Sequence, residues 1–289
     1  MMKQMAKMIL LTMTGVLSTT IIAAEEVQKT VDAEPNGLVS ITNIAGTIEV
    51  VGWSRNQVKV EADLGRGVDE LIVRRDGDEV KVEVMVPSHN RNSRNISSDL
   101  IVHIPENSSI EVVGLSADIE IDLVLGEMRL NSVSGDIFSN VYASDVQIET
   151  VSGVINLEGD HGEMLTEISS VSGNIDTDAL QGDIVANTIN GTLVIDGGSF
   201  DRVQARSVDG KIVFDSELRN GGKLQIGSVS GEVDVHFNGS ILARFDISTV
   251  SSGDINNCFG PESVRVSPPR VANSTSRKTT AIPGSSSRR

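Results

Sequence analysis

Acidic residues recur directly after a motif that contains a glycine, and they are the first candidates for chemistry. Asp118 and Asp136 hold this position in GLSADI and SVSGDI. Stacked on neighbouring strands, their carboxylates would lie about 4.8 Å apart, close enough for a carboxylate pair or a weak cation site. A solvated turn residue without a selective role is the favoured interpretation, because Val154 interrupts the series, which is Asp118, Asp136, Val154, Asn174, Thr192, Lys211, Glu232 and Asp254.

Small hydroxyl residues recur in the same motif. One position holds Ser134, Ser152, Ser172 and Ser230, with Asn190 and Asp209 as its other members. Stacked hydroxyl groups could bind a sugar. Short polar side chains also bond the backbone in tight turns, and glycine tolerates the positive φ that such turns require. The sequence therefore favours a structural role for the motif, as a corner at which the chain turns.

Other catalytic signatures are missing from the sequence. The histidines lack metal-ligand spacing, Cys258 is the single cysteine, and no nucleophile elbow, phosphate-binding glycine loop or HExxH motif occurs. We therefore assign no catalytic, cofactor-binding or metal-binding residue, expect no cofactor and do not expect an enzyme. The histidines are His89, His103, His161 and His236.

The motif is one part of an internal repeat, and its copies follow each other at steps of 18 to 22 residues. Such a short, regular period is typical of stacked repeats that bury a common core. The copies are GLSADI (114–119), SVSGDI (132–137), TVSGVI (150–155), SVSGNI (170–175), TINGTL (188–193), SVDGKI (207–212), SVSGEV (228–233) and TVSSGDI (249–255).

Apolar residues alternate on both sides of each corner, as in a strand with one buried face. Met128 and Leu130 precede the corner at 132–135, and Ile137 follows it. The apolar phase shifts at Val133, so we expect Val133 and Ile137 to point into two faces of a shared core. The pattern predicts an all-β fold: a right-handed parallel β-helix or β-solenoid with coils of 18 to 22 residues over 114–259.

Residues 25–113 also alternate strongly and predict a strand-rich N-terminal section that caps the solenoid. NIAGTIEV (43–50) resembles an early corner. We favour a section that is continuous with the solenoid, and a separate β-sandwich is the alternative.

Residues 1–24 have the composition of a secretory signal peptide, with Lys3 and Lys7 before an apolar run and small residues at Ala23 and Ala24. We expect cleavage after Ala24 and no transmembrane segment in the mature chain, because the apolar run is short for a bilayer. A single cysteine gives an exported chain no internal disulfide, so its stability must come from burial.

The chain is strongly acidic, with a net charge of −16. This charge excludes nucleic acid as a partner, because binding it needs Lys and Arg to neutralise phosphates. Residues 260–289 differ, since they hold six basic residues and one acidic residue and lose all alternation. We expect a disordered basic tail there.

The stretch LVSITNIAGTIEVVGWSRNQVKVEA (38–62), followed by serial SVSGDI-like corners, resembles the bacterial "putative adhesin" family of exported β-strand-repeat proteins, over about residues 36–260. The resemblance implies a right-handed parallel β-helix-like fold and a cell-envelope location, and it brings no catalytic residues. Members of that family are expected to continue with strands after INNCFGP (255–261), often with a second cysteine. The different end suggests a displaced reading frame or truncation, and a functional tail that binds anionic envelope polymers is the alternative.

These features predict an exported protein of the periplasm or cell surface that binds or scaffolds an envelope polymer or protein. A carbohydrate-active β-helix enzyme and an envelope-stress sensing module are the alternatives. The sequence identifies neither the partner nor the oligomeric state.

Overall fold

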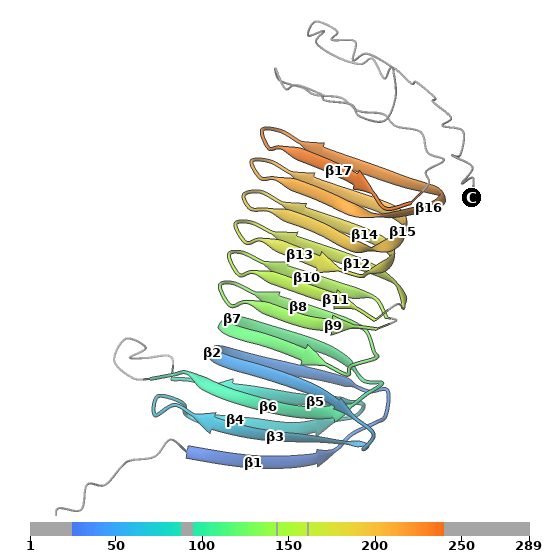
Figure 1. The fold of residues 1–289 in the computed structure, drawn as a ribbon. Helices are drawn as coiled ribbons and strands as arrows, with labels where there is room; N and C mark the ends of the chain where they lie inside the picture. Colours follow the sequence, from blue (N-terminus) through green and yellow to red (C-terminus); the bar gives the residue numbers. More distant parts are fainter. Residues whose placement is uncertain (1–24, 88–94, 143, 161, 240–289) are drawn as a thin grey trace, which may run out of the picture.

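The computed structural model describes residues 25–87, 95–142, 144–160 and 162–239, and within these ranges the chain forms 17 strands and no helix. The strands stack as the rungs of an elongated molecule (Figure 1). The predicted all-β fold with a parallel β-solenoid is confirmed. The predicted signal peptide, the basic tail, Cys258 and the corner TVSSGDI lie outside the described residues.

Each coil of the solenoid consists of one strand before the corner and one strand after it. The strands before the corners form a first wall, and the strands after them form a second wall. The pure first-wall strands are β8 (Met128–Ser132), β10 (Val146–Thr150), β12 (Glu163–Ser170) and β14 (Gln181–Thr188). The pure second-wall strands are β9 (Ile137–Val141), β11 (Ile155–Gly159), β13 (Ile175–Asp178) and β17 (Val233–Phe237).

Four longer strands run from one wall into the other: β2 (Leu38–Trp53), β7 (Ser109–Asp122), β15 (Leu193–Ser207) and β16 (Ile212–Ser228). Equivalent residues of successive coils pair in parallel, so Ile148 lies between Leu130 and Ile168. All three side chains are buried. The core between the walls is therefore built from columns of like aliphatic residues, as the repeat predicts.

The N-terminal strands extend both walls into the cap: β1 (Glu25–Asp32), β3 (Gln57–Leu64), β4 (Glu70–Asp76), β5 (Glu79–Met85) and β6 (Ser98–Pro105). Strand β2 pairs in parallel with β7 on one side and with β5 and β6 on the other. Beyond β5 and β6 the pairing becomes antiparallel, through β4, β3 and β1. The cap and the solenoid therefore share continuous walls, while the division of the chain at residue 113 stays a prediction.

The corner glycines are required by close stacking of the backbone. A Cβ atom on Gly173 would overlap the carbonyl oxygen of Gly153 in the coil beneath, and the same is true of Gly135, Gly153, Gly210 and Gly231 against their own lower neighbours. None of these five has a positive φ. The expectation that the corners need glycine for a positive φ is therefore wrong at these positions, because the limiting factor is the space between rungs.

The edge opposite the corners is held by side-chain hydrogen bonds between coils. Arg219 on β16 binds Glu163 on β12 and Asp201 on β15, at 2.8 and 3.0 Å, and so connects three coils. Asp122 accepts hydrogen bonds from Asn140 Nδ2 at 3.0 Å and from the Tyr142 hydroxyl at 2.8 Å. These bonds, that of Asn140 first, hold the pKa of Asp122 below its usual value although burial opposes them.

We expect Gly173→Ala to lower the free energy of unfolding by about 2 kcal/mol or more, because the added methyl group must force two rungs apart. Gly227→Ala is the matched control, since nothing lies within 4 Å of its Cβ position, and we expect a change within about 0.5 kcal/mol. Urea unfolding measures both variants. Equal stability of the two would contradict the close-approach explanation.

The lowered pKa of Asp122 makes its stabilising effect depend on pH. A depressed folded pKa stabilises the fold above the unfolded value of about 3.9, and this stabilisation is lost as the pH falls through the folded pKa. We expect Asn140→Ala to lower the urea midpoint at pH 7 and to differ less from the parent at pH 3. The control Asn156→Ala should give no such pH-dependent difference, and a constant gap for Asn140→Ala would show that Asp122 is not involved.

Candidate functional site

The first Ser or Thr of the corner binds the corner glycine in four of the described coils. Ser132 Oγ accepts a hydrogen bond from the backbone N–H of Gly135 at 3.0 Å. The residue is buried, as are its equivalents Thr150 and Ser170. The same bond occurs from Gly153 to Thr150, from Gly173 to Ser170 and from Gly231 to Ser228, at 3.2, 2.9 and 2.8 Å. The buried hydroxyls of Thr188 and Ser207 have no hydrogen-bond partner among the residues that the structure describes.

The second serine of the corner joins each coil to the coil beneath. The backbone N–H of Ser134 donates to the carbonyl of Leu115 at 3.0 Å, and its hydroxyl donates to the same oxygen at 3.2 Å. Ser152 binds Val133 in the same way. These hydroxyls therefore serve the corner itself, which supports the structural role over a sugar-binding ladder.

The residues after the corner glycine also bind between coils. Asp118 Oδ1 accepts the backbone N–H of Asp136 at 2.9 Å, and Asp136 Oδ1 accepts that of Val154 at 2.8 Å. Asn174 does the same for Thr192 at 2.9 Å. The two carboxylates thus lie on adjacent rungs as predicted. Each has a defined structural partner, so Asp136 is more than a solvated turn residue.

The apolar residue between the two corner serines points outward, which is the main correction to the sequence-based expectation. Val133 was expected in the shared core with Ile137, but its side chain is 42% exposed whereas Ile137 is fully buried. The inward positions of the corner belong to Ser132 and Gly135, which leaves Val133 in the outward phase.

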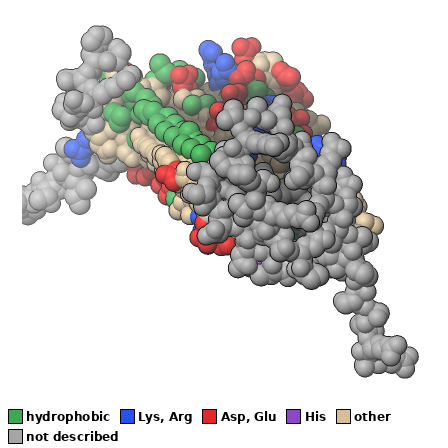
Figure 2. Space-filling view, turned by 90° about the horizontal axis from the view of Figure 1, so that it is seen from above, with side chains coloured by type: hydrophobic (Ala, Val, Ile, Leu, Met, Phe, Trp, Pro, Cys, Tyr) green, Lys and Arg blue, Asp and Glu red, His purple; other side chains and the backbone are tan. Residues whose placement is uncertain are grey.

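The same outward orientation recurs in every described corner and produces an apolar ladder. We define the apolar ladder as Leu115, Val133, Val151, Val171, Ile189, Val208 and Val229, whose side chains are 39% to 65% exposed. Seven rungs at about 4.8 Å extend over roughly 29 Å. Figure 2 shows a row of hydrophobic side chains (green) that runs along the stack.

A shallow open groove of about 470 Å³ runs beside the apolar ladder across four coils. Its floor is the column of inward-pointing corner Ser and Thr residues, one wall is Val151, Val171 and Ile189, and the opposite wall is Asn131, Glu149, Ser169 and Asn187. The groove is straight because equivalent residues pair in register from one coil to the next. The corner edge therefore presents a linear surface that is apolar on one side and polar on the other.

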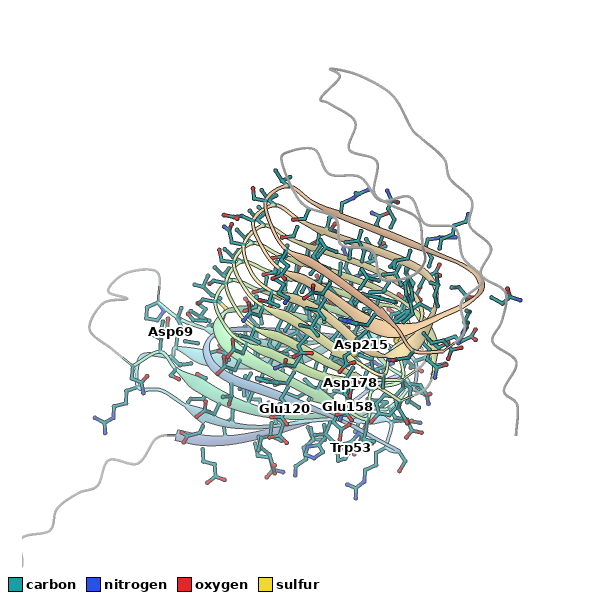
Figure 3. The ribbon with its side chains drawn as sticks, turned by 45° about the horizontal axis from the view of Figure 1, so that its top comes forward. Trp53, Asp69, Glu120, Glu158, Asp178 and Asp215 are labelled. Atoms are coloured by element: carbon teal, nitrogen blue, oxygen red, sulfur yellow. The ribbon has the colours of Figure 1, made fainter. Side chains whose placement is uncertain are left out.

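A column of carboxylates lies on the outer surface of the second wall. Glu158, Asp178, Asp196 and Asp215 pair in register on β11, β13, β15 and β16. Three of them are labelled in Figure 3. Asp196 accepts the N–H of Gly197 at 2.8 Å. None of these four carboxylates directly follows a corner glycine, so the series of residues at that position does not include them.

The histidines are not gathered at one place. His103 packs against Trp53 with ring centroids 5.1 Å apart, and His236 lies on β17. His89 and His161 fall outside the described residues. Within the described ranges, no group of three or more His, Cys, Asp or Glu side chains is placed to hold a metal ion, and no helix is long and apolar enough to span a membrane.

We expect Asp136→Ala to lower the free energy of unfolding by about 1 kcal/mol, because the N–H of Val154 loses its acceptor. Asp136→Asn keeps an acceptor oxygen, as Asn174 does naturally, and should stay within about 0.5 kcal/mol of the parent. Chemical denaturation of both variants provides the comparison. An equal loss in both would mean that the charge matters and not the hydrogen bond.

Several solved structures are similar to this chain, at low sequence identity. A "putative adhesin" from Bacteroides fragilis is 11% identical with a TM-score of 0.47, and the match covers 74% of this chain and 97% of that one. A "putative adhesin" and a "putative lipid binding protein" from Parabacteroides distasonis are 12% and 14% identical, with TM-scores of 0.42 and 0.43. Each of these two matches covers 73% of this chain, and they cover 97% and 96% of the respective neighbour.

No match was found among curated proteins. The family comparison gives one result, which covers most of the sequence and includes the cap coil of β2 and all the described corners. Residues 38–281 match Toastrack DUF4097, so the chain belongs to the Toastrack DUF4097 family.

Proposed function

We propose that the chain is a non-catalytic binding or scaffolding protein of the bacterial cell envelope, and that the corner edge is its binding surface. The observation that supports this proposal is the apolar ladder, an unbroken exposed series on a protein whose net charge is −16. Contiguous apolar surface on a soluble chain marks an interaction site more often than it marks chance.

The charge distribution supports the same surface. The ladder residues are flanked on one side by Ser116, Ser134, Ser152, Ser172 and Ser230, with Asn190 and Asp209 completing that column. A strip that is poor in charge within an acidic surface resembles the centre of a binding interface, where charged residues are depleted. The signal-peptide composition of residues 1–24 is consistent with an envelope location, in the periplasm or at the cell surface.

Hydrogen bonding within the corner indicates why this edge can serve as a rigid surface. The corner serines and the residues after the glycines use their polar groups to bind adjacent coils. The backbone of each corner is thereby fixed against its neighbours before any partner arrives. A partner would then lose little affinity to ordering of the protein. No comparable feature of the described residues favours a carbohydrate-active enzyme or an envelope-stress sensor.

Retention of envelope components by the immobilised exported chain tests the proposal. We expect the triple variant Val151→Ser, Val171→Ser, Ile189→Ser to retain at least about tenfold less than the parent, because three apolar contacts are lost. The matched control is Phe138→Ser with Leu165→Ser, since both side chains are similarly exposed and lie away from the corner edge. If the parent retains nothing above background, or if the control loses as much as the triple variant, the proposed surface is wrong.

A further inference from the structure

The groove beside the apolar ladder is nearly uncharged. Of its eleven lining residues only Glu149 carries a charge. Apart from Glu149, the floor and one wall consist of small hydroxyl and amide side chains, and the other wall is aliphatic. The occupant that fits such a groove has a long uncharged section with an apolar surface.

The groove is also narrow. The apolar ladder is one residue wide, and most of its side chains expose less than half of their surface. A stable protein interface buries about 800 Å² on each partner, which a single column of this width does not supply. Two copies that each carry a net charge of −16 also repel one another. A slender ligand therefore fits better than a second copy of the chain.

One cation lies just beyond the upper end of the groove. Arg206 pairs in register with Asn187, so it occupies the next rung of the polar wall. Its side chain is exposed, and it makes no ion pair with the residues that the structure describes, whereas Arg202 nearby pairs with Asp183. A guanidinium without an ion pair among the described residues, at the end of a nearly uncharged groove, is suited to bind a carboxylate through two hydrogen bonds.

We propose that the groove binds a free long-chain fatty acid, with the alkyl chain along Val151, Val171 and Ile189 and the carboxylate at Arg206. This inference rests on the proposed binding function and names its ligand. A single chain fits because the groove holds one column, whereas a phospholipid would leave its second chain in water. An anionic membrane surface is disfavoured as the partner, because the acidic body of the protein is repelled by it.

The length of the groove sets the length of the ligand. Four rung spacings separate Asn131 from Arg206 along the polar wall, or roughly 19 Å at about 4.8 Å each. An extended alkyl chain advances about 1.3 Å per carbon, given C–C bonds of about 1.5 Å in staggered torsions. The groove is therefore filled by a chain of about 15 carbons.

Calorimetric titration of the full chain with fatty acids of different length tests the inference. We expect hexadecanoate to bind at least about tenfold more tightly than octanoate, and a longer chain of twenty carbons to gain less than about threefold over hexadecanoate. Hexadecyltrimethylammonium, used below its micelle concentration, should bind more weakly than hexadecanoate although the protein is acidic. The opposite preference would overturn the role of Arg206.

Variants assign the binding to the groove. The triple variant Val151→Ser, Val171→Ser, Ile189→Ser and the single variant Arg206→Gln should each weaken hexadecanoate binding by about tenfold or more. Phe138→Ser with Leu165→Ser and Arg202→Gln are the matched controls and should leave binding unchanged. Thermal melts confirm that each variant is folded. Unchanged binding in the triple variant, or no binding by the parent, would overturn the inference.

Two further measurements test the alternative partners of the corner edge, a membrane surface and a second copy of the chain. Sedimentation with phosphatidylglycerol vesicles that depends on Val151, Val171 and Ile189, without hexadecanoate binding, would assign the edge to a membrane surface. A parent dimer that the triple variant converts to a monomer in light scattering would assign it to a second copy. Either result overturns the fatty-acid inference. Envelope retention lost in the triple variant, without hexadecanoate binding, also overturns this inference but leaves the proposed function standing.

Discussion

The closeness of successive backbones at the corners determines most of this structure. There is no room for a Cβ atom between Gly173 and the carbonyl of Gly153, and the corners at Gly135, Gly153, Gly210 and Gly231 are equally close to the coil beneath. These coils must therefore place glycine at the same point. The N–H of Gly173 then needs an acceptor, and Ser170, the inward residue three positions earlier, supplies it, as its equivalents do at Gly135, Gly153 and Gly231. The residue that follows this Ser or Thr has no inward position left, so its side chain must face solvent. The apolar ladder consists of the residues at this outward-facing position in successive coils.

Steric constraint explains the direction of these side chains but not their chemistry. Threonine has the same β-branched shape as valine and is equally suited to an extended backbone, and it would expose a hydroxyl group to water. All seven rungs nevertheless carry Leu, Val or Ile. Contacts between stacked like side chains offset part of the free-energy cost of exposing these apolar side chains to water. The proposed binding role would account for the absence of threonine from every rung.

The sequence predicts the repeat, the strands and the corners, because the period of about twenty residues and the two-residue alternation are both visible in it. It also contained the signal that places Val133 outside: Leu130 is inward, and Ser132 continues that phase. The reason for the corner glycines could not be predicted, since a positive φ and a close approach both select glycine. The sequence also allows a prediction of the carboxylate column, because each of its members lies five residues after a corner glycine: Glu158, Asp178, Asp196 and Asp215.

In-register stacking also determines whether the corner edge favours a linear ligand over a compact one. In a solenoid, equivalent residues of successive coils stack in a straight column, so every rung offers a ligand the same small contact surface. Each rung adds a similar increment of apolar contact, and affinity grows with the number of rungs that a ligand covers. A compact ligand reaches one or two rungs and gains little. A linear ligand gains from all of them. Arg206 lies at one end of the groove, so a ligand with a carboxylate at one end would bind in a single orientation.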